Sequence, residues 1–154
     1  MSTDIIVHPI PLESKRNLYL RLLYDAVREH TEDAARFVVE ERSLLSVLFA
    51  RGSKHVVHVH WANQLYGSKY WVKSLARIIF NFSLLFLIRN VRGFTVVWTM
   101  HNVYTHDYRH RWIDRLGRHL LMKVAHATVV QNERFLAKFT KQYPNDRIMH
   151  IRHL

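Results

Sequence analysis

Residues 94–107 read FTVVWTMHNVYTHD, and this stretch decides the fold class of the chain. Its apolar start, TVVW, predicts a strand that runs directly into side chains able to hydrogen-bond or exchange protons. A second apolar strand, predicted over residues 55–60, also ends in polar groups, His58 and His60, followed by Trp61. Two strands that end in polar clusters indicate an open parallel α/β sheet with a ligand crevice at the strand tips.

Predicted strands alternate with predicted helices along the whole chain. Strands are expected over residues 4–8, 37–40, 55–60, 94–99, 128–130 and 148–151, and helices over residues 18–30, 43–50, 73–90, 109–125 and 133–142. This alternation predicts βαβ units with right-handed crossovers, and therefore a Rossmann-like open parallel sheet flanked by helices. Pro9 and Pro11 are expected to close the first strand, and Ser43 is expected to cap the second helix.

Composition excludes several classes of protein. The length of 154 residues suits one domain with a real core, and 49% apolar residues are too many for a disordered chain. Without cysteine, disulfides and thiolate metal sites are impossible, and the N-terminus lacks the pattern of a signal peptide. The apolar run at residues 78–88 is shorter than the roughly 20 residues of a membrane span, so it predicts a buried helix. We therefore expect a cytoplasmic protein.

Positive charge is concentrated in the second half of the chain. The formal net charge is +11; residues 1–77 hold 11 Lys and Arg against 8 acids, whereas residues 78–154 hold 12 against 4. Such an imbalance favours anionic partners, namely phosphates, acidic lipid or nucleic acid, although the chain shows no recognised nucleic-acid-binding motif. The predicted helix over residues 109–125 has an apolar stripe formed by Ile113, Leu116, Leu120 and Val124.

The arginines of that helix allow two interpretations. Arg109, Arg111, Arg115 and Arg118 either contact anionic lipid or phosphate or form an ordinary solvated face. Contact with lipid would place the protein peripherally on the inner face of the cell membrane.

The segment HVHW at residues 58–61 places two imidazoles on one face of a strand, because side chains alternate along a strand. Zinc would need a third and a fourth ligand, and no HExxH pattern is present, so we expect no metal. His60 is instead expected at the strand tip, facing the crevice. Trp61, with Asn63 close behind it, suits a platform for a sugar, and an apolar plug of the core is an equally open interpretation of Trp61.

The segment after the next strand carries the candidate chemistry. Thr99 and Asn102 can donate and accept hydrogen bonds at once, as sugar hydroxyls require, and Tyr104 lies close to them in sequence. His101 can hold a proton near neutral pH. Asp107 and the adjacent His106 are candidate general bases, and the alternative for Asp107 is the capping of the following helix.

No phosphate-binding glycine loop is visible. GxGxxG, Walker and GxSxG patterns are absent, and none of the four glycines lies in a turn from a strand to a helix. We expect no tightly bound nucleotide and no cofactor in these residues.

The order HVHW, long helix, VVWTMHNVYTHD, basic helix and ATVVQN resembles the N-terminal domain of GT-B glycosyltransferases. The likeness is greatest to family 4 enzymes and to bacterial mannosyl- and glucuronosyltransferases of exopolysaccharide assembly. NLYLRLL at residues 17–23 is similar to the helix after their first strand, and IMHIRHL at residues 148–154 is similar to the segment before their second domain. The resemblance covers nearly all 154 residues, but His8-Pro9-Ile10-Pro11 stands where many relatives have a Gly-Gly loop.

That resemblance implies an acceptor-binding half of a two-domain enzyme. A second domain would bind the nucleotide sugar, and it is expected to be absent from residues 1–154, so activity would need a separate donor-domain chain or a longer protein. The resemblance implies catalysis by Asp107, His101 or His106, and acceptor binding by His60, Trp61, Asn63, Thr99, Asn102 and Tyr104. The acceptor would be a glycan or a lipid-linked sugar. The alternative from a different class is a non-catalytic basic module that docks on anionic membrane or on a partner transferase.

Overall fold

The computed structural model of the chain describes residues 4–11, 18–30, 37–52, 54–101, 110–130, 136–137, 140–141 and 148–150. Its strands are β1 (Ile5–Ile10), β2 (Phe37–Val39), β3 (Lys54–Val59), β4 (Thr95–Met100), β5 (Ala127–Val130) and β6 (Ile148–His150). Its helices are α1 (Leu18–Glu29), α2 (Leu44–Leu48), α3 (Asn63–Tyr66), α4 (Trp71–Asn90) and α5 (Arg111–Val124). The six predicted strands and the helices over residues 18–30, 43–50, 73–90 and 109–125 are thus confirmed within a few residues. Of the predicted helix at residues 133–142, the described residues 136–137 and 140–141 are helical.

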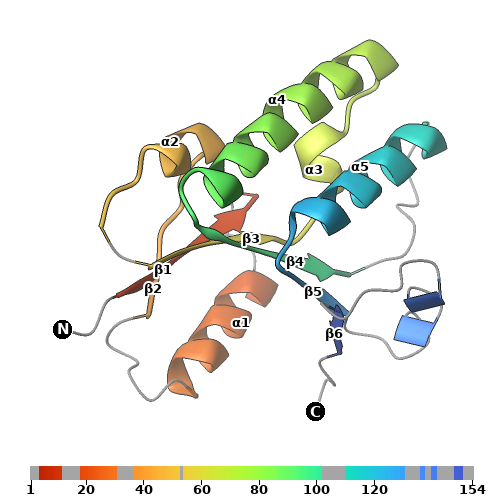
Figure 1. Ribbon diagram of the computed structural model, residues 1–154. Coiled ribbons are helices and arrows are strands. Elements are labelled where there is room, and N and C mark those ends of the chain that lie inside the picture. Colours follow the sequence, from red (N-terminus) through yellow and green to blue (C-terminus); the bar gives the residue numbers. More distant parts are fainter. Residues whose placement is uncertain are drawn as a thin grey trace.

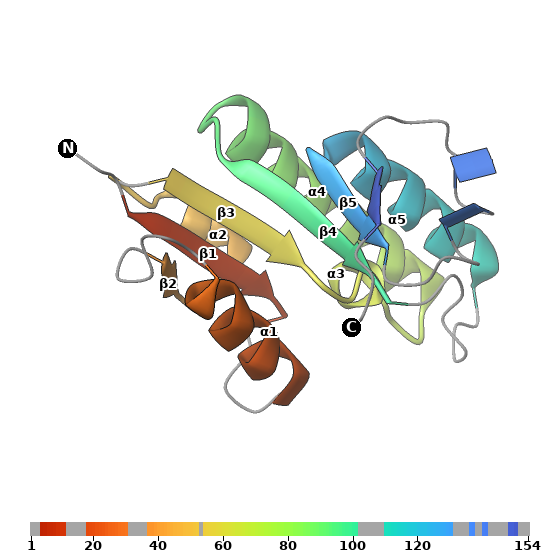
Figure 2. The ribbon, with the colours of Figure 1, turned by 90° about the horizontal axis from the view of Figure 1, so that it is seen from below.

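The six strands form one parallel sheet in the order β2-β1-β3-β4-β5-β6. Helix α1 covers one face of the sheet, and α2, α3, α4 and α5 cover the other (Figure 1). Seen from the side of α1, the strands lie next to one another with their arrowheads toward the same edge (Figure 2). The predicted α/β architecture, a Rossmann-like open parallel sheet flanked by helices, is therefore observed.

The core lies mainly between the sheet and the layer of α2, α4 and α5. β-branched side chains such as Val57, Val59 and Val96 are fully buried there, as is typical of central parallel strands. Trp98 is 1% exposed and Tyr66 of α3 is fully buried. Ser43 caps α2 as predicted: its hydroxyl accepts a hydrogen bond from the backbone N–H of Ser46 at 3.2 Å.

One prediction about the end of a strand is wrong, and one helix face is wider than predicted. Strand β1 continues through Pro9 to Ile10, and Pro9 is tolerated there because β2 ends at Val39, which pairs with Val7. In α5 the residues facing the core are Ile113, Asp114, Gly117, Leu121 and Met122. Of the predicted stripe, Ile113 is fully buried and Leu116, Leu120 and Val124 are partly buried against the core, so the stripe is confirmed. The buried face is wider than predicted, because it also includes Asp114, Gly117, Leu121 and Met122.

Helix α4 is buried on one side only, whereas the sequence predicted a buried helix. Ile78, Phe82, Leu85 and Ile88 pack into the core, but Ile79, Phe80 and Phe86 are exposed. Among the described residues, α4 is the one helix long and apolar enough to cross a membrane by length and composition, with a third of its most apolar window buried. Helix α4 thus carries apolar side chains on two faces, of which one packs into the core and the other is exposed.

Candidate functional site at the strand tips

The topology points to one position at the carboxyl edge of the sheet. The connection from β1 to β2 runs through α1 on one face of the sheet. The connections that contain α2, α3, α4 and α5 run on the other face (Figure 1). The direction in which successive strands are added to the sheet therefore reverses between β1 and β3. In open α/β sheets the ligand crevice lies outside the strand ends at such a switch point. The backbone N–H of His60 donates to the carbonyl oxygen of Ile10 at 2.9 Å. His60 therefore follows β3 directly at the switch point.

Residues that follow β3 and β4 meet around His60. The rings of His60 and His101 have centroids 5.7 Å apart at an interplanar angle of 29°, and Trp61 stacks on His101 at 5.1 Å and 15°. A small cavity of about 40 Å³ is lined by His60, Trp61, Asn63 and His101, together with Arg118 of α5 and the apolar Ala62, Trp98 and Met100. Side chains far apart in the sequence thus share one concave surface.

A chain of hydrogen bonds supports His60 from behind. The hydroxyl of Tyr24, on α1, lies 2.9 Å from Nε2 of His60 and 3.1 Å from Nδ1 of His58. Nε2 of His58 lies 2.8 Å from the hydroxyl oxygen of Thr99. Tyr24 has a single proton to donate, so at least one of the two imidazoles donates its N–H to the phenol oxygen. These bonds can all form with His58 and His60 as neutral imidazoles.

Burial also keeps these imidazoles neutral. It lowers the pKa of His60 to about 2, with help from the nearby His58 and His101, and it lowers the pKa of His58 to about 4, with help from His101. Burial raises the pKa of the Tyr24 phenol, and the nearby Tyr19 adds to this shift. Among the described residues, Nδ1 of His60 is buried and has no hydrogen-bond partner. A ligand that reached the cavity would find this nitrogen able to accept or donate a hydrogen bond.

Of the two interpretations left open for Arg118, the solvated face of α5 is not observed. Its Nε donates to Oδ2 of Asp114 at 2.9 Å, and the two side chains are 12% and 9% exposed. Asp114 also accepts a hydrogen bond of 2.7 Å from the hydroxyl of Tyr66. The pairing turns Arg118 inward, so its guanidinium lines the cavity beside His60.

Apart from Arg118, the predicted site residues fall into four groups. Thr99 is 2% exposed and bonds to His58 behind the cavity, and Arg111 and Arg115 are exposed on α5. Asn63, Trp61, His60 and His101 lie at the cavity. The positions outside the described residues are Asn102, Tyr104, His106, Asp107 and Arg109.

Sequence reasoning missed the contribution of α1. Tyr19 contacts His101 edge-on, with ring centroids 5.0 Å apart, and Tyr24 bonds to both His58 and His60. A signal for this role was present, because two tyrosines in the helix after β1 lie close to the carboxyl edge of that strand.

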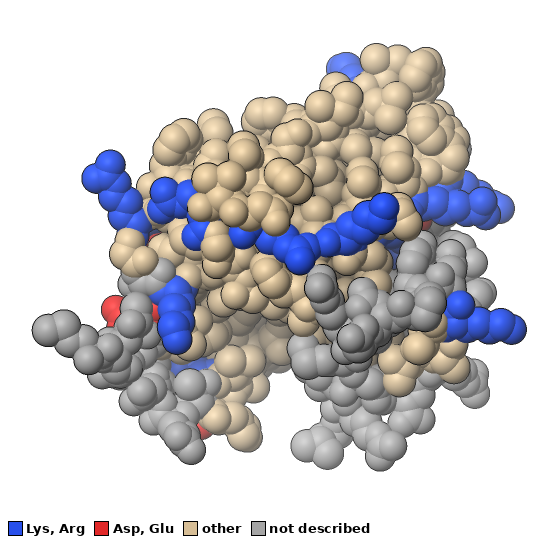
Figure 3. Space-filling view, in the orientation of Figure 1, with Lys and Arg blue, Asp and Glu red and all other residues tan. Residues whose placement is uncertain are grey.

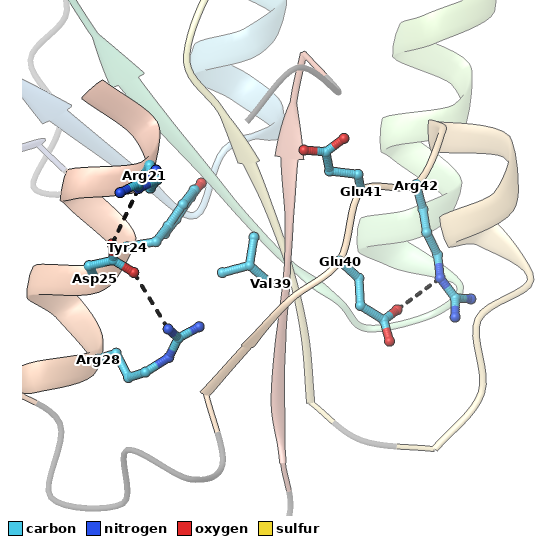
Figure 4. A pocket seen from close by; sticks show the side chains of 8 residues that line it. All are labelled: Arg21, Tyr24, Asp25, Arg28, Val39, Glu40, Glu41 and Arg42. Carbon is cyan, nitrogen blue, oxygen red and sulfur yellow. Dashed lines mark hydrogen bonds and ion pairs between the residues drawn. The ribbon is translucent and has the colours of Figure 1, made fainter. Parts of the chain in front are cut away.

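A larger open pocket of about 650 Å³ lies between α1 and the end of β2 (Figure 4). Its lining consists of Arg21, Tyr24, Asp25, Arg28, Val39, Glu40, Glu41 and Arg42. The charged groups pair within their own segments: Asp25 with Arg21 and Arg28, and Glu40 with Arg42 at 2.8 Å. In the sequence, the charged run EER at residues 40–42, directly after β2, could have indicated this pocket. Tyr24 borders this pocket and also bonds to His60, so the two concavities are neighbours.

Comparison of the chain with protein-family models, with curated proteins and with solved structures finds no match in any of the three. Within the described part of the chain, no three His, Asp or Glu side chains are arranged to hold a metal ion.

Proposed function

We propose that this chain is the acceptor-binding half of a GT-B glycosyltransferase, which transfers a sugar from a nucleotide sugar to a hydroxyl group of a glycan or lipid-linked acceptor. One observation carries the proposal: His60, Trp61 and His101 form a stacked cluster at the switch point of a parallel sheet. The indole of Trp61 stacks on His101 and packs against the Val7, Leu20 and Tyr24 cluster, and its remaining exposed surface would meet the C–H side of a sugar ring. Asn63 and the buried Nδ1 of His60 offer hydrogen bonds to its hydroxyl groups.

The low pKa of His60 assigns it a positioning role. A base with a pKa of about 2 accepts a proton poorly near neutral pH, whereas a neutral imidazole fixed by Tyr24 orients a hydroxyl group well. The acceptor oxygen would then form a bond to the anomeric carbon, and the bond from that carbon to the nucleotide diphosphate would break. The hydroxyl proton would pass to His101 or to a carboxylate or imidazole of the following loop, Asp107 or His106.

Arg118 would contribute a fixed positive charge at the same cavity. Asp114, which itself accepts a hydrogen bond from Tyr66, holds the Arg118 side chain, so little side-chain freedom is lost when a phosphate oxygen approaches the guanidinium. A phosphate of the donor or of a lipid carrier is the ligand class that fits this charge. The nucleotide itself would be bound by a second domain.

The proposal is tested by titrating the chain with a panel of oligosaccharides while the fluorescence of its tryptophans is followed. Trp61→Leu and His60→Asn should abolish saturable quenching, whereas Trp112→Leu, at an exposed tryptophan of α5, should leave the affinity unchanged. Turnover is then measured after supplying a donor-binding domain in trans with nucleotide sugars and a lipid-linked acceptor. Sugar binding that survives both Trp61→Leu and His60→Asn would refute the proposal.

A further inference from the structure

The helical face of the molecule carries a broad apolar strip. On α4, which lies outermost over the sheet, the exposed positions fall at helical spacing and include Val72, Ile79, Phe80, Phe86 and Leu87, with Ala76 and Ser83 between them. Ile79 is 69% exposed, Phe80 58% and Phe86 57%. This strip continues onto α2, which contacts α4 and exposes Leu45 and Phe49. We call these exposed residues of α2 and α4 the apolar strip.

Positive charge borders the apolar strip, and negative charge is nearly absent from the same face. Residues 43–130, which contain α2 to α5, hold 12 Lys and Arg but only two acids, Asp107 and Asp114. Asp107 lies outside the described residues, and Asp114 is buried against Arg118. Figure 3 views the molecule from the side, in the orientation of Figure 1, and shows Lys and Arg side chains in a row below α4, with a largely uncharged surface above the row.

The basic residues come from α5, which lies beside α4, and from the start of α4. The exposed basic positions of α5, which packs against α4, are Arg111, Arg115, His119 and Lys123. At the start of α4, the ammonium groups of Lys69 and Lys73 lie 5.8 and 5.5 Å from the ring centroid of Tyr70, itself 56% exposed. Arg89 holds α4 and α5 together by donating to the carbonyl oxygen of Val124 at 2.9 Å. The apolar and basic surfaces are therefore parts of one rigid layer.

We propose that this face docks on an anionic phospholipid bilayer, with α4 lying flat in the interface. Apolar side chains enter the boundary between headgroups and acyl chains while the flanking Lys and Arg meet acidic headgroups, which is the arrangement that stabilises interfacial helices. A flat position follows from the packing, because Ile78, Phe82, Leu85 and Ile88 hold α4 to the sheet. The scarcity of Asp and Glu on this face favours an anionic partner. An uncharged bilayer or an apolar protein surface would form no ion pairs with the basic border. This inference is independent of the proposed transferase activity.

The test is flotation of the purified chain with vesicles of phosphatidylcholine alone and of phosphatidylcholine mixed with phosphatidylglycerol. We expect stronger binding to the mixed vesicles and weaker binding as salt is raised, because salt screens the basic border. The double variant Phe80→Ser/Phe86→Ser should bind at least about tenfold more weakly, since it removes two large exposed rings. Its matched control is Leu18→Ser/Leu22→Ser, which removes exposed apolar side chains from α1 on the opposite face and should bind as the wild type does.

A second pair of variants tests the charge. Arg115→Gln/Lys123→Gln should weaken binding to the mixed vesicles about fivefold per charge, whereas Arg21→Gln on α1 should not change it. Circular dichroism establishes that each variant is folded. Equal binding of Phe80→Ser/Phe86→Ser and wild type would overturn the proposal. So would a wild-type dimer that ignores vesicles and dissociates in that variant, because the apolar strip would then be covered by a second copy.

Discussion

Gly117 of α5 lies directly against the ring of Tyr66 of α3: a Cβ built on Gly117 would meet Cε1 of that ring at 2.4 Å. The ring has little room to move, because it is fully buried and its hydroxyl donates to Asp114. The two helices therefore meet without space for a side chain, and this close contact fixes the turn of α5 that carries Arg118 toward the cavity.

Gly117→Ala is expected to destabilise the fold by about 1–2 kcal/mol. Alanine is favoured over glycine within a helix by about 1 kcal/mol, but overpacking a core costs about 1–3 kcal/mol. Three ring atoms of Tyr66 would lie within 2.8 Å of the new Cβ. The loss of stability from overpacking should therefore be at the upper end of that range. Urea unfolding measures the change, and in a Tyr66→Leu background the same substitution should be less costly. Equal or greater stability of the single variant would contradict the contact.

Asp114→Asn should be far more damaging than the matched change Asp25→Asn. Removing the Asp114 carboxylate leaves the guanidinium of Arg118 buried without its counter-charge, a loss of about 3 kcal/mol or more. Asp25 also pairs with arginines, Arg21 and Arg28, but these side chains are exposed, so its loss should cost less than about 1 kcal/mol. Thermal and urea unfolding of the two variants give the comparison. Similar losses would mean that Asp114 is solvated in the native protein.

Tyr24→Phe removes the hydroxyl that joins His58 to His60. Both imidazoles then lose a hydrogen-bond partner in a largely buried site, at an expected cost of about 1–3 kcal/mol. Tyr70→Phe is the control, because Tyr70 is exposed and its ring keeps the same shape. Nitrogen NMR of the histidine side chains adds a direct readout: the tautomer signals of His58 and His60 should change in Tyr24→Phe and remain unchanged in Tyr70→Phe.

Stability is expected to fall as the solution is acidified. In the unfolded chain His58 and His60 titrate near the ordinary value of about 6.5, whereas folding lowers their pKa to about 4 and about 2. The unfolded state therefore binds more protons below about pH 6.5, and each imidazole removes up to about 1.4 kcal/mol of stability per pH unit. This loss continues until the pH reaches each folded-state pKa, and above about pH 6.5 neither group contributes a slope.

Buried His8, whose pKa is also lowered by burial, adds to this loss in the same direction. Urea unfolding at a series of pH values should show the slope, and His58→Gln and His60→Gln should each reduce it. The exposed His119→Gln should leave it intact. A pH-independent free energy of unfolding between about pH 4 and about pH 6.5 would show that these imidazoles are solvated in the native state.

The order of strands and helices could be predicted because each strand is a short apolar run, α1 and α5 have a strong periodic pattern, and α4 contains a long apolar run. Two kinds of detail could not. Helix α3 has four residues, too few to show a period. The buried face of α5 centres on Gly117 and Asp114, residues that a hydrophobic pattern assigns to the outside, and only their tertiary partners explain their burial.

The positions of the candidate site residues along the sheet edge could be predicted, but their contacts with other helices could not. The positions of His60, Trp61 and His101 could be predicted because each follows an apolar run that forms a strand. The carboxyl ends of neighbouring parallel strands lie at one edge of the sheet. The roles of Tyr24 and Arg118 depend on contacts between distant segments, α1 with β3 and α5 with α3. The spacing of Asp114 and Arg118 allows an ion pair within α5, but the sequence alone does not show that Tyr66 reaches Asp114 or that Tyr24 reaches His60.

The shortness of β2 has a consequence for the molecule's solubility. On that side of β1, the described strand pairing stops at Val7, and the next residue whose backbone would face outward is Pro9. Proline has no N–H to offer, so an intruding strand from another chain would lack a donor at that position. The part of β1 that extends beyond β2 thus resists edge-to-edge aggregation, because Pro9 lacks a backbone N–H.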